Sequence, residues 1–295
     1  MIRHAAVVTV IASFLSFPPI ARAEQYHYSM TARVRPFLLF WISRSGVGTA
    51  TVTRQHAADS ARYSLLIGTD PERAPRRINR WGYIDEEISG TQAHLVGLMT
   101  QSDEESIEQA DASLRAQAAG RHPFKAIQAT IADGQATSVV ATIAAQSDYT
   151  FRDVAAALDL ARRESSAGKS RVVQLPPGTR PGFLTALADA IHAGSPAPIC
   201  YVYHGRMYEL RQTRIERTAN FRIGAIEYGG AAAADFLVRS LYDGEQARFS
   251  IVYGTSGALA DVPIKVTYQP RWWMQVELTL DDPANGHQIA GGVER

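Results

Sequence analysis

The sequence predicts a β-rich α+β protein built on one curved antiparallel sheet, a half-barrel or an open barrel, with a helical middle segment at about residues 101–194. Three observations lead to this fold class. Apolar and polar residues alternate with the two-residue period of half-buried strands at both ends of the chain. Asp-Gly and His-Gly pairs separate such runs at hairpin spacing. The middle segment instead carries helix caps and helical periodicity.

The first residues have the three successive features of a secretory signal peptide. Arg3 and His4 give a basic start, residues 5–17 are apolar, and Ala21-Arg22-Ala23 is a small-x-small cleavage site. The apolar run is shorter than the roughly 20 residues that span a bilayer. We therefore expect a signal peptide over residues 1–23, cleaved after Ala23, and a single β-rich domain over residues 24–295.

Composition and cysteine content agree with an exported protein. The chain has 295 residues, a formal net charge of +1 and a single cysteine, Cys200. The near-neutral charge gives no reason to expect nucleic acid as a partner, and a single thiol forms no internal disulfide. Glu24 stands where a lipoprotein would carry its acylated cysteine, and no later segment reaches spanning length. We expect a periplasmic or secreted protein with no transmembrane segment after cleavage.

The N-terminal half reads mainly as strands. Residues 26–35 alternate cleanly, and residues 46–54, 62–68 and 91–100 continue the pattern. One face of the first strand carries Tyr26, Tyr28, Met30, Ala32 and Val34. Gly46 and Gly48 indicate a turn or bulge in the second strand. Residues 125–145 predict a hairpin that turns at Asp133-Gly134.

Three helices are expected in the middle segment. Ser102 and Glu105 have capping-box spacing at the start of residues 102–120. Thr150 is placed to cap residues 151–164. Pro181 begins a third helix, which Gly194 ends.

The C-terminal part predicts three further hairpins, with turns at His204-Gly205, at Asp243-Gly244 and near Pro270. Such short connections favour antiparallel pairing, because parallel strands need long crossovers.

The last hairpin contains two adjacent tryptophans. In its expected return strand, periodicity puts Trp272 on the apolar face and Trp273 on the polar face. Two interpretations of Trp273 stay open. The protein's own chain covers it, or it belongs to a ligand or partner surface to which Arg271 adds a charge.

The most unusual charged segment is "TDPERAPRRINRWGYIDEE". Arginine binds carboxylates and phosphates with two parallel hydrogen bonds and stacks on aromatic rings. The candidate ligand-binding residues here are Arg76, Arg77, Arg80 and Trp81. The alternative is an internal ion-pair network with Asp70, Glu72 and the acidic run at residues 85–87.

Sequence motifs give no support for a known catalytic or cofactor site. No H-E-x-x-H, G-x-S-x-G, complete P-loop or dinucleotide fingerprint occurs in the chain. Cys200 and His204 would stand about 13 Å apart along a strand, too far for a catalytic pair. The histidines lack ligand-like spacing. We predict no metal and no cofactor.

Several stretches together resemble a group of uncharacterised exported bacterial proteins. They are "RPFLLFWISRSGVGTATVTR", "LLIGTDPERAPRRINRWGYI", "LMTQSDEESIEQA", "YVYHGRMYEL" and "DVPIKVTYQPRWWMQVEL". The two ends are also distantly similar to the DUF3108 family, in the Gly-rich "GVG" strand and the late "PIKV" hairpin. The resemblance implies a β-rich exported protein with a role in the cell envelope, and it supplies no catalytic residues.

Three functions are compatible with these observations. The first is a non-enzymatic protein that binds a lipid-like, glycan or anionic molecule, or an envelope protein, on its curved sheet. Its groove would be walled by Tyr201, Tyr203 and Trp273. The second is a hydrolase or carbohydrate-active enzyme that pairs Glu209 with Glu227 or Glu277 at roughly 5–10 Å. The third is a structural interaction module that uses Trp273 or an exposed sheet edge.

Overall fold

A computed structural model describes residues 22–35, 41–100, 123–144, 149–165, 168–223, 226–271 and 273–281. Fourteen strands in this part of the chain form one antiparallel sheet, accompanied by two α-helices. The strands are β1 (Arg22–Val34), β2 (Ile42–His56), β3 (Ser60–Thr69), β4 (Trp81–Ser89), β5 (Gln92–Thr100), β6 (Phe124–Ala132), β7 (Gln135–Ile143), β8 (Lys169–Gln174), β9 (Ile199–Tyr203), β10 (Arg206–Ile223), β11 (Ile226–Ser240), β12 (Gln246–Gly254), β13 (Pro263–Arg271) and β14 (Met274–Leu280). The helices are α2 (Val154–Glu164) and α3 (Phe183–Ala193), with short 3-10 turns η2 (Pro75–Arg77), η3 (Phe151–Asp153) and η5 (Gly257–Leu259).

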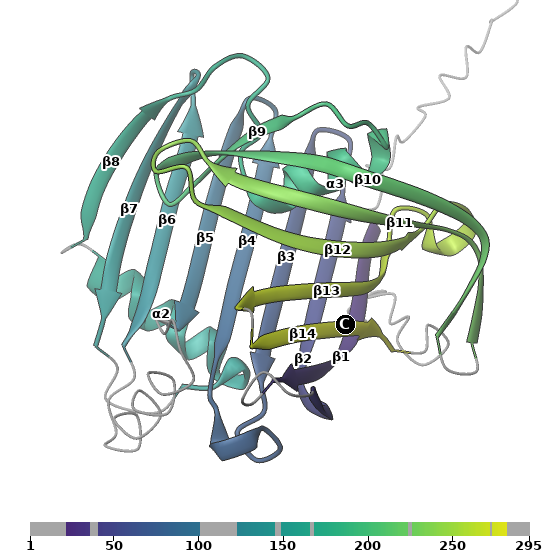
Figure 1. Ribbon diagram of the computed structural model, residues 1–295. Helices are drawn as coiled ribbons and strands as arrows, with labels where there is room; N and C mark the ends of the chain where they lie inside the picture. The colour runs from purple at the N-terminus through teal and green to yellow at the C-terminus, as the bar shows by residue number, and fades with distance from the viewer. Residues whose placement is uncertain are drawn as a thin grey trace, which may run out of the picture.

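The sheet is bent into two layers. Its strand order is β8-β7-β6-β5-β4-β3-β2-β1-β14-β13-β12-β11-β10-β9, so the first and last strands of the chain pair in its middle. Figure 1 shows β1 to β8 as one layer, with β9 to β14 folded across it at a steep angle. Layers that cross in this way pack their inner faces against each other. The predicted fold class, a curved open antiparallel sheet, is confirmed.

One apolar face continues through both layers. Tyr28 of β1 stands opposite Ala50 of β2 and Leu280 of β14. On the next strands, Val266 stands opposite both Leu278 and Ile251. Because directly opposed residues point to the same side of a sheet, these side chains share the inner face. Their burial confirms the predicted alternation in β1 and in the last hairpin.

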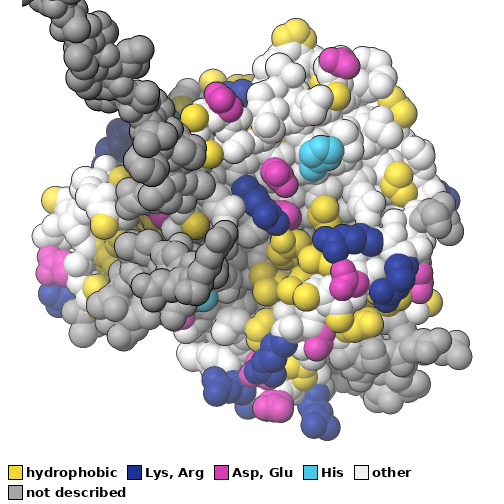
Figure 2. Space-filling model, turned by 180° about the vertical axis from the view of Figure 1, so that it is seen from behind, with side chains coloured by type: hydrophobic (Ala, Val, Ile, Leu, Met, Phe, Trp, Pro, Cys, Tyr) yellow, Lys and Arg dark blue, Asp and Glu magenta, His cyan; other side chains and the backbone are white. Residues whose placement is uncertain are grey.

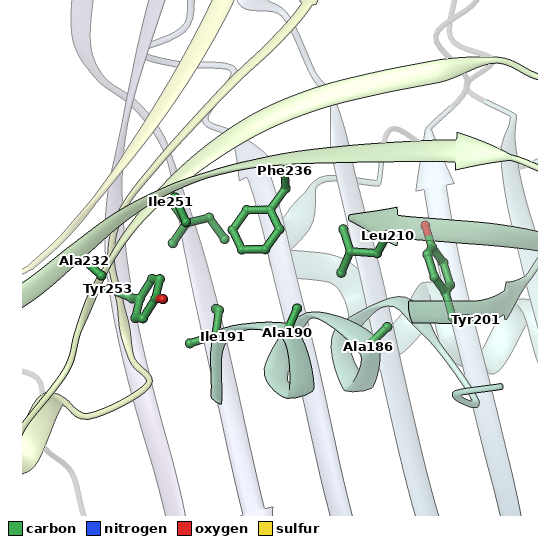
Figure 3. Packing of buried hydrophobic residues seen from close by; sticks show 10 residues of the cluster. Ala186, Ala190, Ile191, Tyr201, Leu210, Ala232, Phe236, Ile251 and Tyr253 are labelled. Atoms are coloured by element: carbon green, nitrogen blue, oxygen red, sulfur yellow. The ribbon is translucent and has the colours of Figure 1, made fainter. Parts of the chain in front are cut away.

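Helix α3 fills the space between the two layers. It presents Ala186, Ala190 and Ile191 to Phe236, Ile251 and other inner-face residues of β9 to β12 (Figure 3). The small alanines allow the helix to lie close to the strands. As predicted, α3 ends at Gly194, which adopts a φ of 53°.

The N-terminus of α3 is held by a carboxylate on the opposite layer. Glu86 of β4 accepts hydrogen bonds from the backbone N–H of Leu184 at 2.7 Å and of Thr185 at 2.8 Å, and from the Thr185 hydroxyl. Its charge also complements the positive end of the helix dipole. The approach is so close that a Cβ at Gly182 would lie 2.2 Å from Glu86 Cδ. Burial raises the pKa of Glu86, while the three hydrogen bonds act in the opposite direction.

Helix α2 covers the other face of β4 to β7. Its N-terminal turn has the predicted cap, since Arg152 N–H donates to Thr150 Oγ1 and Asp153 accepts from Thr150 N–H. Ala157 and Ala161 pack with Trp81, Leu98 and Phe124. Trp81 and Glu86 therefore lie on opposite faces of β4, which is covered on both sides.

Two features of the middle of the chain differ from the prediction. Residues 81–89 form strand β4, where no strand was predicted. Residues 169–174 form strand β8, which was also not predicted. The β6–β7 hairpin turns at Asp133 and Gly134 as predicted, with φ of 51° and 72°. The helix expected over residues 102–120 lies outside the described residues.

We expect Glu86→Ala to lower the free energy of unfolding by about 2–4 kcal/mol, because three buried donors lose their acceptor. The matched control is Glu87→Ala, an exposed neighbour on the opposite face of β4, which should change it by less than about 0.5 kcal/mol. Urea unfolding of both variants measures the difference. Equal stability of the two variants would show that the Glu86 cap is not needed.

Candidate functional site

Trp273 lies in the turn of the last hairpin. Strand β13 ends at Arg271 and β14 begins at Met274, and these two residues face each other. The turn therefore begins directly after Arg271, near Pro270 as predicted. The expected strand alternation does not apply to Trp273, because this residue lies in the turn before β14 begins. Trp272 lies outside the described residues.

Trp273 is buried by the protein's own chain. Its side chain is 8% exposed, although periodicity had put it on the polar face. Its carbonyl oxygen accepts a hydrogen bond from Arg35 N–H at 2.8 Å, which ties the turn to the end of β1. Of the two interpretations of this residue, cover by the protein's own chain is the one that the structure supports.

Around this turn, four neighbouring strands end in one row, which we call the rim. Ile42 of β2 stands opposite Val34 of β1, and Val34 stands opposite Met274 of β14, which faces Arg271 of β13. The described residues of the rim are Val34, Arg35, Trp41, Ile42, Arg44, Tyr268, Arg271, Trp273 and Met274.

The rim is where the apolar inner face reaches solvent. Exposure increases toward the end of β1. Met30 is 3% exposed, whereas Val34, the last residue of the strand, is half-buried. Ile42 is 52% exposed, Tyr268 is 39% exposed and Trp41 is 38% exposed. Large apolar side chains that are exposed together indicate a contact surface more strongly than scattered ones.

Positive charge accompanies these apolar side chains. In residues 32–35, 41–45, 267–271 and 273–277, four arginines (Arg33, Arg35, Arg44 and Arg271) stand against one acid, Glu277. Glu277 pairs with Lys265 at 2.9 Å and with Arg33 at 3.6 Å. The Arg35 guanidinium lies 6.0 Å from the centre of the Trp41 ring. Burial raises the pKa of Tyr268, and the charge of Arg271 acts against this rise.

The other candidate cluster divides between core and surface. Trp81 is 5% exposed, donates its indole N–H to the Tyr149 carbonyl at 2.9 Å and lies 5.7 Å from the Phe124 ring. It is a core residue and forms no exposed shelf for a ligand. Arg77 is exposed at a φ of 56° and Arg80 is half-buried. The side chain of Arg76 lies outside the described residues.

The acids near this cluster have partners both within it and elsewhere in the chain. Asp70 contacts Arg152 at 2.9 Å and Arg73 at 3.8 Å, whereas Asp85 pairs with Arg62 and Glu86 caps α3. The acidic run at residues 85–87 lies in the second half of strand β4, so the length of the strand separates it from η2. Its contacts are therefore made with the elements that surround β4. Seen from behind, basic and acidic side chains alternate across the molecule without merging into one basic patch (Figure 2).

The aromatic groove expected inside the sheet is filled. Tyr201 is 3% exposed, packs 5.8 Å from Phe183 of α3 and stacks on Tyr208 at 5.4 Å. The enclosed space beside Tyr203 measures about 10 Å³, which is the size of one water molecule. Tyr201 and Tyr203 therefore contribute to the core together with α3.

A larger hollow of about 250 Å³ lies on the outer face of β10 to β13. Its charged groups are engaged with each other: Arg214 with Glu216, Asp235 with Ser250, and Lys265 with Glu277. Charges neutralised in this way favour a solvated surface more than a ligand site.

The carboxylates proposed for a hydrolase are not brought together. Glu209 lies near one end of β10 and contacts Arg239, whereas Glu227 contacts Arg222 near the other end, roughly 40 Å away along the strand. Glu277 of β14 is four strand spacings from β10, roughly 19 Å. Neither pair meets the separation that glycoside hydrolysis needs.

Cys200 and His204 also do not form a pair. Cys200 lies in β9, and His204 begins the β9–β10 turn with a φ of 55°. Burial lowers the pKa of His204 to about 4, and Lys125, Arg206 and Arg171 add to this effect. A neutral, half-buried turn histidine agrees with a structural role.

Within the described ranges, the protein has neither a metal-binding cluster nor a helical membrane span. Those residues contain no group of three or more His, Cys, Asp or Glu side chains that could hold a metal ion. They also contain no helix long and apolar enough to cross a membrane. Comparison of the chain with family models, curated proteins and solved structures gave no match. The resemblance to DUF3108 proteins remains a prediction.

Sequence reasoning found Arg271 and Trp273 but missed the other side of the rim. Trp41, Ile42 and Arg44 belong to "RPFLLFWISR", an apolar run enclosed by arginines. An apolar run enclosed by arginines can be recognised in the sequence as a candidate contact segment. Periodicity does not predict the pairing of β1 with β14, which places Val34 and Ile42 beside Met274 and Arg271.

We expect Trp81→Ala to lower the free energy of unfolding by about 3–5 kcal/mol, because it removes a buried aromatic ring. Arg77→Asn serves as the control, since asparagine tolerates a positive φ, and it should change stability by less than about 0.5 kcal/mol. Urea denaturation compares the two. A stable Trp81→Ala protein would contradict the core assignment.

The low pKa of His204 predicts a loss of stability in acid. The unfolded chain takes up the imidazole proton near pH 6.5, whereas the folded protein does so only near pH 4. Stability is therefore complete above pH 6.5 and falls by up to about 3 kcal/mol as the pH drops to 4. We expect His204→Asn to reduce this dependence, and His94→Asn, at an exposed position, to leave it unchanged. Unfolding curves measured from pH 4 to 7.5 test the difference.

Proposed function

We propose that this chain is an exported, non-enzymatic protein of the cell envelope that binds an amphipathic, negatively charged molecule at the rim of its curved sheet. The signal-peptide features at residues 1–23 support export to the periplasm or beyond. The observation that carries the proposal is the exposure of Trp41, Ile42 and Tyr268 next to Arg35, Arg44 and Arg271.

The chemistry of the rim fits a ligand with an apolar part and an anionic part. Exposed aromatic and aliphatic side chains offer contact area to the apolar part. Arginine forks suit phosphate or carboxylate groups, and they stack on neighbouring rings as Arg35 does near Trp41. Anionic lipids and acidic glycolipids both carry an apolar part and an anionic part, so both fit the rim.

Binding at the rim is favoured over binding inside the sheet. The inner face between the layers is occupied by α3, whose apolar residues contact β9 to β12. A ligand in that space would have to displace a helix that Glu86 caps with three hydrogen bonds. At the rim, by contrast, the apolar side chains are already exposed.

A soluble lipid analogue tests this function. We expect short-chain phosphatidylglycerol, kept monomeric, to change the tryptophan fluorescence of the mature protein and to bind at least about fivefold tighter than short-chain phosphatidylcholine. Arg44→Glu should weaken binding of the anionic analogue about fivefold or more. The matched control is Arg171→Glu, an exposed arginine of the edge strand β8, which is six strands away from β2 in the sheet order.

Native mass spectrometry of protein purified from its own periplasm gives an independent check on the ligand. We expect a bound molecule with an acidic headgroup and an apolar chain. Equal affinity for the two short-chain lipids, or equal effects of the two arginine variants, would argue against an anionic site at the rim.

A further inference from the structure

We infer that the partner of the rim is the surface of an anionic lipid bilayer, on which the protein docks peripherally. This inference rests on the proposed function and specifies its ligand. A bilayer surface, unlike a single ligand molecule, requires apolar side chains, aromatic rings and basic groups along one extended line.

The geometry of the rim is extended. The row from Ile42 through Val34 and Met274 to Arg271 crosses four adjacent strands. With strands spaced by about 4.8 Å, it is roughly 14 Å long. Neither of the two hollows described above includes any of these residues. A line of strand ends that lies outside both of these hollows matches a surface better than a small molecule.

The exposed apolar side chains are of the kinds found at membrane interfaces. Trp41 and Tyr268 have apolar rings with one polar group, which suits the boundary between headgroups and acyl chains. Ile42, more than half exposed, offers apolar area that gains from leaving water.

The charges of the rim have the sign that an anionic bilayer attracts. The rim carries Arg35, Arg44 and Arg271. The one acid in these strand ends, Glu277, pairs with Lys265 and with Arg33, which lies beside the rim. Arginine at such an interface keeps its guanidinium at headgroup level while its stem lies along apolar neighbours. The whole chain has a net charge of only +1, so this local excess is a property of the rim.

An acidic protein is the main competing partner, and the exposed apolar groups argue against it. Binding of an acidic peptide requires paired charges, and it leaves Ile42 and Trp41 with no specific partner. A bilayer uses both kinds of side chain at once. The acidic-protein alternative is included below as an outcome of the test.

Sedimentation with vesicles tests the inference. The mature protein is mixed with phosphatidylcholine vesicles that contain roughly a quarter phosphatidylglycerol, and with vesicles of phosphatidylcholine alone. We expect at least about fivefold more bound protein on the anionic vesicles, a decrease on adding salt, and a blue shift of the tryptophan emission.

Two matched variants locate the surface. The double substitution Trp41→Ser with Ile42→Ser should reduce the vesicle-bound fraction about fivefold or more. Leu241→Ser with Tyr242→Ser removes a comparable exposed apolar pair, 46% and 73% exposed, at the β11–β12 turn, and should leave binding unchanged. Urea unfolding confirms that both proteins are folded.

The outcomes separate this inference from the proposed function. Binding of monomeric phosphatidylglycerol without binding of anionic vesicles overturns the bilayer inference and leaves the proposed function standing. If the protein binds neither monomeric phosphatidylglycerol nor anionic vesicles, both the bilayer inference and the proposed function are overturned. Equal losses from the two double variants, or tighter binding of polyglutamate than of vesicles, also overturn the bilayer inference, the second result in favour of an acidic protein partner.

Discussion

The pairing of β1 with β14 is the constraint on which the rest of the structure depends. It joins the first and last strands of the chain, in register from Tyr28 opposite Leu280 to Val34 opposite Met274. Without this ladder, two separate meanders would each expose an apolar face. With it, one face continues through both layers and becomes a common core. The same ladder brings the ends of four strands together, so the rim is a direct consequence of the pairing of β1 with β14.

The filled interior decides where a ligand meets the protein. In many curved sheets the concave side is a cavity, but here α3 lies between the layers and is anchored from both sides. Glu86 holds its N-terminus from one layer, and Phe236 and Ile251 pack against it from the other. The burial of a carboxylate is costly unless it is well hydrogen-bonded, and three donors meet that requirement. The surfaces open to partners are therefore the outer face and the strand ends.

The two arginine-rich regions show why charge alone is a poor guide to a site. The cluster at residues 73–81 attracts attention in the sequence, yet Trp81 belongs to the core, and the nearby Asp70 pairs with Arg73 of the cluster as well as with Arg152. The rim has fewer adjacent charges in the sequence, because they come from four strands. Its distinguishing property is the combination of exposed apolar side chains with positive charge, which becomes visible only after the strands are paired.

The sequence by itself determined the class of the fold and most of its local elements. Alternation in residues 26–35, the Asp133-Gly134 turn and the Thr150 cap depend only on neighbouring residues, so local physics was enough to predict them. Tertiary structure decided the rest. Strand β4 was not predicted, because the partners of its charged residues are distant in the chain, and Trp273 is buried because it lies in a turn, where strand alternation does not apply. The position of α3 and the assembly of the rim depend on long-range pairing, which no local pattern encodes.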